Sequence, residues 1–312
     1  MQSIAALADP DWEVLVVDDG STENIREVVE RFAPLARYLW QANAGPSAAR
    51  NNGFRATSGQ YVRFLDSDDY FLSVRGLREQ VTLLDAHPEV GLVYAQATKV
   101  DTHRRPLGVR KSPWARQSYI HTGDTELTRL LFYNYITTSS TLVRRTVFEQ
   151  AGSFRTEISS GEDWDCWLRI AHISSVGYVA EPVVAYRVHE KSLTARYSSM
   201  PWLPTHLNTL DTLFADPEFA LRHSRLREPI YAYLDVIAAS EAYRTRNMKL
   251  SRLYALKALR RTMRSRRWGD SMQSFWILSK SLIPSGVRER LKSLRKQQRL
   301  VTMRTLLLLR RG

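Results

Sequence analysis

The amino-acid sequence predicts an α/β protein with a mainly parallel sheet flanked by helices, followed by a mostly helical C-terminal extension. Three observations lead to this fold class. Apolar runs of strand length alternate with helical segments as far as about residue 97, which is the pattern of a parallel sheet. Acidic clusters follow two of the predicted strands, where open α/β sheets bind their ligands. Beyond about residue 205 the chain becomes helical and increasingly basic.

The first hundred residues supply the strands and helices in alternation. WEVLVV, residues 12–17, is apolar at almost every position, as in a strand that is buried on both faces. Residues 25–33 place their apolar side chains on one helical face. Pro46 follows a turn and suits the first turn of a helix. The other predicted elements here are strands at 38–41, 61–65 and 91–97 and helices at 47–57 and 75–86.

The alternation loosens after residue 100. Residues 103–114 are predicted to form a loop. Within 159–172, Trp164, Trp167, Leu168 and Ala171 lie on one helical face. Further elements are predicted as helices at 124–133 and 145–151 and as strands at 138–144, 177–179 and 183–187. We place a first domain at residues 1–200 and a helical basic extension at 201–312.

Charge separates these two parts. Residues 1–200 carry 22 Lys and Arg against 24 Asp and Glu, whereas residues 201–312 carry 23 against 8. Residues 287–301 combine an apolar face with basic residues, which is typical of a helix that binds an anionic membrane surface. A solvated helix that packs on the domain and a nucleic-acid patch are the alternatives. No nucleic-acid motif accompanies the charge, so we expect no nucleic-acid partner.

The chain is expected to be cytoplasmic. Its one cysteine, Cys166, excludes an intrachain disulfide and fits a reducing compartment. The first residues lack a basic segment followed by a long apolar run, so no signal peptide is expected. No stretch approaches the roughly 20 apolar residues of a membrane span.

Two acidic clusters are the main candidates for chemistry. Asp18 and Asp19 close one predicted strand, and the stretch FLDSDDYF places Asp66, Asp68 and Asp69 after another. Clustered carboxylates repel one another unless a cation neutralises them, and hard oxygen ligands suit Mg²⁺ or Mn²⁺ bound to substrate phosphates. The alternative is that these residues only form turns and helix N-caps, which Asp favours.

Five motifs in order resemble a known family. They are VDDGST at 17–22, NAG at 43–45 with ARNNG at 49–53, GQY at 59–61, LDSDD at 65–69 and GEDWD at 161–165. Over roughly residues 1–195 the sequence resembles an inverting glycosyltransferase of family 2, with the Rossmann-like GT-A fold. The resemblance implies transfer of a sugar from a nucleotide-diphosphate sugar to a hydroxyl of a saccharide or lipid-linked acceptor.

The resemblance also implies roles for the donor site. Asp18 or Asp19 would bind the nucleobase or ribose, and Arg50 would lie near the nucleotide. Asp66 would contact the ribose and the metal, and Asp68 would be the direct ligand of Mg²⁺ or Mn²⁺. His189, in a late segment that resembles the family's, would complete the metal shell, although a lone histidine is usually structural or exposed.

On the acceptor side, the resemblance makes Asp163 the catalytic base. Glu162 and Trp164 would line the acceptor site. The local pattern allows another role, because Ser160 to Asp163 fits a helix-start motif in which Asp163 only complements the helix dipole. Trp164 could equally belong to the core, since it lies on the apolar face.

The sequence departs from the family at its start. Family members begin with a strand and a helix before the strand that ends in Asp-Asp-Gly-Ser, whereas this chain starts inside that helix, at residues 3–7. We expect the family's first strand to be missing and Met1 to be an internal or misassigned start. Loss of this central strand would leave unpaired backbone groups on its neighbours. The alternative function is therefore a non-catalytic nucleotide-sugar-binding or membrane-associated scaffold, while the expected function is cell-surface polysaccharide or glycolipid synthesis at the cytoplasmic membrane face.

Overall fold

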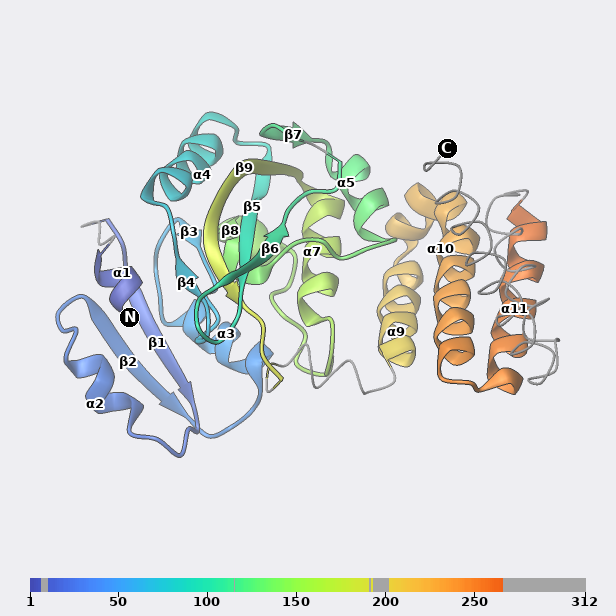
Figure 1. Ribbon diagram of the computed structural model, residues 1–312. Helices are drawn as coiled ribbons and strands as arrows, with labels where there is room; N and C mark the ends of the chain where they lie inside the picture. Colours follow the sequence, from blue (N-terminus) through green and yellow to red (C-terminus); the bar gives the residue numbers. More distant parts are fainter. Residues whose placement is uncertain (7–10, 115, 191, 193–201, 266–312) are drawn as a thin grey trace, which may run out of the picture. The chain divides into compact units, whose positions relative to one another are not determined.

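The structure is a computed structural model that describes residues 1–6, 11–114, 116–190, 192 and 202–265. The chain divides into two compact units, of which the first runs from Met1 to Phe219 and the second begins at Ala220. All described strands belong to the first unit (Figure 1). The helical segment predicted at 287–301 lies outside the described residues.

The described elements follow the predicted alternation. The strands are β1 (Val14–Asp19), β2 (Ala36–Gln41), β3 (Tyr61–Val62), β4 (Tyr70–Phe71), β5 (Val90–Val100), β6 (Pro106–Arg110), β7 (Tyr119–His121), β8 (Leu142–Arg144) and β9 (Ser175–Arg187). The helices are α1 (Gln2–Ala6), α2 (Ile25–Glu30), α3 (Pro46–Arg55), α4 (Val74–Ala86), α5 (Gly123–Leu130), the 3₁₀ turn η1 (Thr138–Ser140), α6 (Arg145–Gln150), α7 (Glu162–Ile173), α9 (Trp202–Ala215), α10 (Pro217–Arg244) and α11 (Met248–Ser265).

The predicted α/β class is confirmed, and the sheet is mixed. β1 and β2 form a parallel pair, and a larger sheet has the order β3-β8-β5-β9-β4, with β6 on β5 and β7 on β9. The long strands β5 and β9 run parallel, and the other pairs of the larger sheet are antiparallel.

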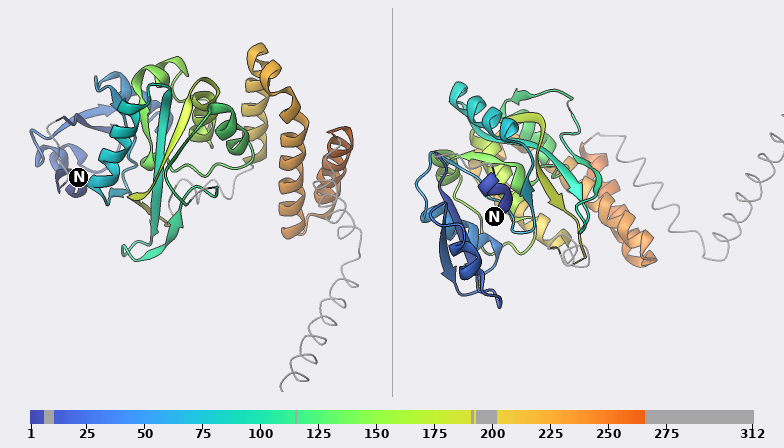
Figure 2. Two further views of the ribbon diagram at one scale, coloured as in Figure 1. Left: turned by 90° about the horizontal axis from the view of Figure 1, so that it is seen from above. Right: turned by 60° about the vertical axis from the view of Figure 1, so that its left-hand side comes forward.

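Helices cover both faces of the larger sheet. Val93, Ala95 and Ala97 of β5 pack with Leu77 and Leu84 of α4. The intervening residues point to the opposite face, because side chains alternate along a strand. On that face lie α5 and α7, as Figures 1 and 2 show. The apolar face predicted for α7 is fully formed, with Trp164, Trp167, Leu168 and Ala171 all buried.

A glycine sets the approach of α5 to α7. A Cβ atom built on Gly123, the first residue of α5, would lie 2.0 Å from the carbonyl oxygen of Ala171. Only a residue without a side chain permits this contact. The N-terminus of α5 can therefore sit directly against the last turn of α7.

Several predicted elements change extent for local reasons. The predicted strand 138–144 begins as the 3₁₀ turn η1, because the hydroxyls of Ser140 and Thr141 bond back to the carbonyls of Thr137 and Thr138. The predicted strands 177–179 and 183–187 join into β9, whose pairing with β5 is irregular at Pro182, a residue that cannot donate to the ladder. The predicted loop 103–114 contains β6, which pairs with the end of β5.

The β1–β2 pair is separate from the larger sheet. In the described residues β1 pairs only with β2, and β3 pairs only with β8. β1 is the first described strand, and the short helix α1 precedes it.

The second unit contains most of α10 and all of α11. Val236 and Ala239 of α10 pack with Ala255 and Ala258 of α11. Small side chains at this contact allow the two helices to approach closely. Within the described residues, no helix is both long enough and apolar enough to span a bilayer.

Candidate active site

The acidic loop between β3 and β4 separates its carboxylates into different environments. Asp66 accepts a hydrogen bond of 2.8 Å from Nη2 of Arg50. The Oδ2 atom of Asp68 lies 2.9 Å from Nε2 of His189. The backbone carbonyl oxygen of Asp68 accepts a hydrogen bond from Nε of Arg187. Two of the predicted metal ligands, 121 residues apart in the chain, are therefore in direct contact.

Asp69 is a structural carboxylate. It is buried and accepts hydrogen bonds from the Ser139 hydroxyl at 2.6 Å and from the backbone N–H of Arg187 at 2.9 Å. Burial raises the pKa of Asp69 to about 7, although both hydrogen bonds oppose this shift. Asp69 thus fastens the acidic loop to η1 and β9, and it leaves Asp66 and Asp68 as the more accessible pair.

Arg50 joins the acidic loop to the start of α7. It projects from α3, donates to Asp66, and donates from Nη1 to Oε1 of Glu162 at 2.9 Å. Its side chain is 13% exposed, and its guanidinium lies over the ring of Phe154. Burial would disfavour this charge, but the two carboxylates compensate, so the pKa of Arg50 stays above its ordinary value.

Asp163 lies in the first turn of α7. Its Oδ1 accepts from the Asn134 amide at 3.2 Å and from the backbone N–H of Trp164 at 2.7 Å, and its Oδ2 accepts from the Thr138 hydroxyl at 3.1 Å. The helix N-cap is Gly161, with φ of 80°, and no side chain caps the helix. The helix-start pattern based on Ser160 is therefore not formed, and Asp163 is oriented by η1 and the segment before it.

Asn134, Thr138 and Ser139 are site residues that the sequence did not identify. Thr138 holds Asp163, whereas Ser139 holds Asp69 and accepts from the backbone N–H of Asp66. The only local signal is the polar run TTSST at 137–141, of which the sequence predicts residues 138–141 as part of a strand. The structure shows that this run links the acidic loop to α7.

Glu162 and Trp164 are both buried. Burial, followed by the neighbouring charge of Asp163, raises the pKa of Glu162, whereas Arg50 lowers it. Trp164 donates its indole N–H to the Leu130 carbonyl at 2.6 Å, and its ring stacks on His206 of α9. Trp164 therefore occupies the core, which was the alternative to a place in an acceptor site.

Asp18 and Asp19 organise the end of β1. Asp18 accepts from the Tyr38 hydroxyl at 2.6 Å and from the backbone N–H of Ser21 at 2.8 Å, and these bonds lower its pKa. Asp19 accepts from the side chain of Gln41 and from the backbone N–H groups of Ala44 and Gly45. Both carboxylates thus shape the turns after β1 and β2, and none of these contacts joins them to the acidic loop.

The described residues include no group of three or more His, Cys, Asp or Glu side chains arranged to hold a metal ion. The pair of Asp68 and His189 nevertheless fits one edge of such a site. Adjacent ligands of an octahedral Mg²⁺ stand about 3 Å apart, given bonds of about 2.1 Å. The observed 2.9 Å is a hydrogen-bond distance that is compatible with this spacing. Asp66 is not part of this pair, and its Oδ1 atom accepts from Arg50.

The model of the family described as glycosyl transferase family 2 matches residues 1–152. Residues 1–152 therefore belong to glycosyl transferase family 2. The matched residues include the turns after β1 and β2, Arg50, the acidic loop and η1, whereas Asp163 and His189 follow them.

Curated relatives of this family 2 domain include the O-antigen biosynthesis protein RfbC of Myxococcus xanthus. It is 31% identical over 199 residues, which are 62% of this chain and 14% of RfbC. An uncharacterized glycosyltransferase of Rickettsia felis is 25% identical over 193 residues, which are 60% of this chain and 30% of that protein. The chain thus spans less than a third of the length of either relative.

A solved structure shares the fold of the family 2 domain and of the residues that follow it. The structure of S. aureus TarS 1-349 in complex with UDP-GlcNAc matches with a TM-score of 0.60 and 17% identity, covering 89% of this chain and 85% of that one. This likeness shows that the two chains share a fold, as the expected GT-A architecture requires.

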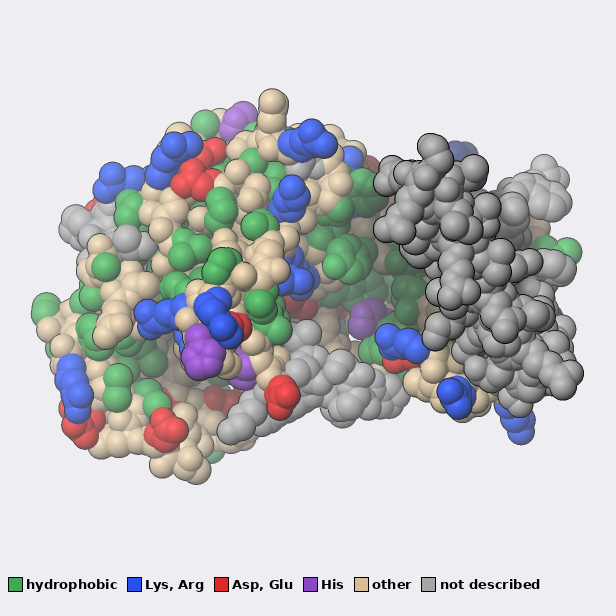
Figure 3. All heavy atoms as spheres, viewed as in Figure 1, with side chains coloured by type: hydrophobic (Ala, Val, Ile, Leu, Met, Phe, Trp, Pro, Cys, Tyr) green, Lys and Arg blue, Asp and Glu red, His purple; other side chains and the backbone are tan. Residues whose placement is uncertain are grey.

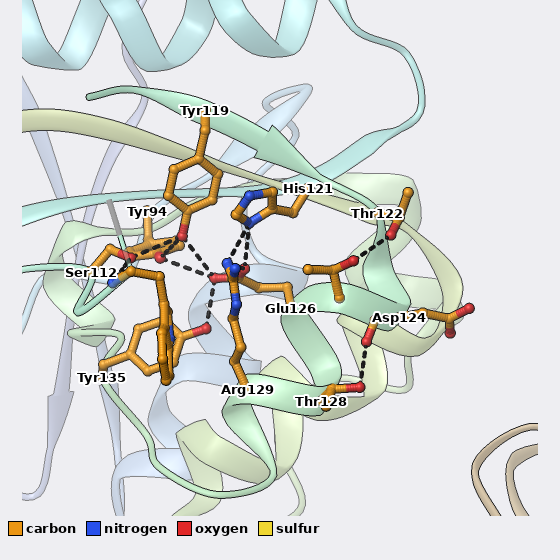
Figure 4. A network of polar contacts seen from close by, with 12 residues as sticks. Tyr94, Ser112, Tyr119, His121, Thr122, Asp124, Glu126, Thr128, Arg129 and Tyr135 are labelled. Atoms are coloured by element: carbon orange, nitrogen blue, oxygen red, sulfur yellow. Dashed lines mark hydrogen bonds and ion pairs between the residues drawn. The ribbon is translucent and has the colours of Figure 1, made fainter. Parts of the chain in front are cut away.

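A second polar cluster is centred on the fully buried Glu126 (Figure 4). Its Oε1 atom accepts from the hydroxyls of Tyr94, Tyr119 and Tyr135 at 2.7–3.2 Å. Burial, followed by the charge of Glu126, raises the pKa of Tyr119 to about 12, so this hydroxyl stays protonated and donates. Tyr135 is the neighbour of Asn134, and the cluster therefore supports the segment that holds Asp163.

Proposed function

We propose that the chain transfers a sugar from a nucleotide-diphosphate sugar to a hydroxyl of a saccharide or lipid-linked acceptor, with inversion at the anomeric carbon. One observation carries the proposal. Arg50 bonds both to Asp66 of the acidic loop and to Glu162, the residue before Asp163. The predicted donor carboxylate and the predicted base thus belong to one connected cluster, although they come from segments almost 100 residues apart.

In this proposal Asp163 is the general base. Its carboxylate takes the proton of the acceptor hydroxyl while the hydroxyl oxygen bonds to the anomeric carbon and the bond to the diphosphate oxygen breaks. A single displacement of this kind inverts the configuration. Asn134 and Thr138 hold both carboxylate oxygens by donating to them, which keeps Asp163 oriented before the acceptor arrives.

Asp68 and His189 would hold Mg²⁺ or Mn²⁺, with Asp66 as a further ligand. The cation would neutralise the charge that builds up on the departing diphosphate. Asp18, Asp19, Arg50 and Asp66 remain the proposed nucleotide-binding residues. A nucleotide-sugar donor is supported by the solved TarS structures, which contain UDP-GlcNAc and UDP.

For the acceptor side, we keep Glu162 as a proposed contact. The role proposed for Trp164 is weakened, because only 3% of this residue is exposed. The name of RfbC, an O-antigen biosynthesis protein, supports polysaccharide synthesis as the setting. We expect the reaction at the cytoplasmic face of a membrane, with the chain bound peripherally.

A scaffold that binds a nucleotide sugar without turning it over is the second candidate function. Two observations favour it. β1 and β3 each have a single strand partner in the described residues, and Asp66 is engaged by Arg50 rather than placed beside Asp68 and His189. Binding and transfer must therefore be measured separately.

The first experiment is thermal unfolding with UDP and with GDP, each with and without Mn²⁺. We expect a metal-dependent rise in melting temperature for the chain and for a control variant, Asp124→Asn, and no such rise for Asp68→Asn. The second experiment measures nucleotide release from a panel of nucleotide sugars. Asp163→Asn should keep the melting shift and lose turnover. Absence of turnover in the parent chain, with the shift intact, would establish the scaffold instead.

A further inference from the structure

Helix α11 has an exposed side that carries large apolar residues. Its opposite side is covered, because Ala255 and Ala258 pack on α10. Met263 is 70% exposed and Leu253 is 48% exposed. We use the term α11 outer face for the exposed apolar residues together with their basic neighbours. The apolar members are Leu250, Leu253, Leu256 and Met263.

The same side of α11 is basic. The exposed basic members of the α11 outer face are Lys249, Lys257 and Arg260. No aspartate or glutamate occurs anywhere in Met248–Ser265. Arg261 differs from these residues, because it pairs with Asp235 and Glu228 of α10. The acidic groups of α10 thus form ion pairs with Arg261, and the charge of Asp235 also interacts with Lys257.

Charge limits what can cover the α11 outer face. A second copy would bring an equally basic face against it. Residues 266–312 carry 12 Lys and Arg against Asp270 and Glu289, so this segment brings no complementary charge either. The first unit is only mildly acidic, because residues 1–219 carry 22 Lys and Arg against 27 Asp and Glu, and acidic and basic side chains are interspersed on the face in Figure 3. The complementary partner is therefore an anionic one.

We propose that the α11 outer face binds the surface of an anionic lipid bilayer. Exposed leucines and a methionine suit the boundary between headgroups and acyl chains, while the lysines and arginine suit the anionic headgroups. A nucleic acid would use the cations but would leave the apolar side chains without a partner, since phosphate contacts carry its non-specific binding. The proposal differs from the sequence prediction, which placed the membrane contact at 287–301. It does not depend on sugar transfer.

The helix lies in the plane of the interface, with its apolar side chains immersed and its basic side chains beside the headgroups. Each basic residue near an anionic surface strengthens binding by roughly fivefold. Removal of the three exposed charges should therefore weaken vesicle binding by about a hundredfold. Exchange of the exposed apolar residues for serine should abolish insertion of α11 into the bilayer interface, whatever the charge of the bilayer.

The test is co-sedimentation of the full chain with phosphatidylcholine vesicles that contain either no or roughly 30% phosphatidylglycerol. The apolar variant is Leu253→Ser/Leu256→Ser/Met263→Ser, and its matched control is Leu107→Ser/Val109→Ser/Leu221→Ser, at three other exposed positions. The charge variant is Lys249→Gln/Lys257→Gln/Arg260→Gln, and its control is Arg31→Gln/Arg75→Gln/Arg105→Gln, also at exposed positions. Circular dichroism and melting temperature establish that each variant is folded.

We expect the parent chain and both controls to sediment with anionic vesicles only, and both α11 variants to stay in the supernatant. Equal sedimentation of the folded α11 variants and their controls would overturn the proposal and move the contact elsewhere, for example to 287–301. Equal binding to neutral vesicles would overturn the role of charge. Tight binding of single-stranded RNA that survives in the apolar variant, without vesicle binding by the parent chain, would identify a nucleic-acid surface instead.

Discussion

Thr138 donates a hydrogen bond of 3.1 Å to one carboxylate oxygen of Asp163. Its neighbour Ser139 donates to Asp69 in the acidic loop, and it also accepts from the backbone of Asp66. One short 3₁₀ turn therefore fixes the proposed base and the proposed donor loop at the same time. A small shift of this turn would disturb both ends of the reaction.

Substitution of Thr138 should affect the base more than the fold. Thr138→Val keeps the side-chain volume and removes the donor to Asp163. Because a hydrogen bond to a charged group is worth about 1.5–3 kcal/mol, kcat should fall by about ten- to a hundredfold. The KM for the donor should hardly change. Steady-state kinetics with Thr128→Val as the control measures this, and an unchanged kcat would show that Thr138 does not position the base.

Arg50 and Glu162 should make strongly coupled contributions to the free energy of unfolding. Arg50→Gln leaves the buried Glu162 without a cation and should cost about 3 kcal/mol of unfolding free energy. Glu162→Gln alone leaves Arg50 paired with Asp66 and should cost less. Urea unfolding of both single variants and of the double variant forms a thermodynamic cycle. We expect the double variant to be more stable than the sum of the single losses predicts. Strict additivity would contradict the pairing.

The Glu126 cluster should be essential for stability. Glu126 is fully buried, and its carboxylate receives three tyrosine hydroxyls. Glu126→Gln replaces one acceptor oxygen with an amide NH2 group, which is a donor and faces other donors. The free energy of unfolding should therefore fall by about 3 kcal/mol. Chemical denaturation with Glu149→Gln, an exposed position on α6, as the control measures the difference. Equal midpoints for the two variants would mean that the cluster contributes nothing.

His206 should make the folded state less stable at acidic pH. Burial lowers the pKa of His206, although the Trp202 carbonyl and the charge of Asp163 oppose the shift. The unfolded chain therefore binds a proton at higher pH than the folded one, near the ordinary histidine value of about 6.5. Its contribution to stability is present above that pH and is lost as the pH falls through the lower, folded-state value.

The variant His206→Phe keeps a ring against Trp164 and cannot take up a proton. Unfolding free energies between roughly pH 8 and pH 5 should decline less for this variant than for the parent chain. The exposed His103→Gln serves as the control and should follow the parent chain. Parallel pH profiles for the parent chain and His206→Phe would show that His206 is not the responsible group.

The local sequence pattern was sufficient to predict most helices and strands of the first unit. The apolar run before Asp18, the amphipathic residues of α4 and the one-sided face of α7 predict their structures, because strand and helix periodicity is a property of neighbouring residues. The motif order also predicted the family. The extent of β9 and the 3₁₀ turn η1 escaped prediction, because tertiary pairing and side-chain bonds to the backbone decide them.

The sequence by itself determined which residue types follow the strands and begin α7, and hence that Asp66, Asp68 and Asp163 are the candidates for chemistry. The tertiary structure alone decided which carboxylates are buried and what they contact. Asp69 became a structural anchor, Trp164 became a core residue, and Arg50 became bonded to Glu162, which lies 112 residues away in the chain. The physical reason is that burial and pairing of charge depend on contacts between distant segments, and no local periodicity encodes these contacts.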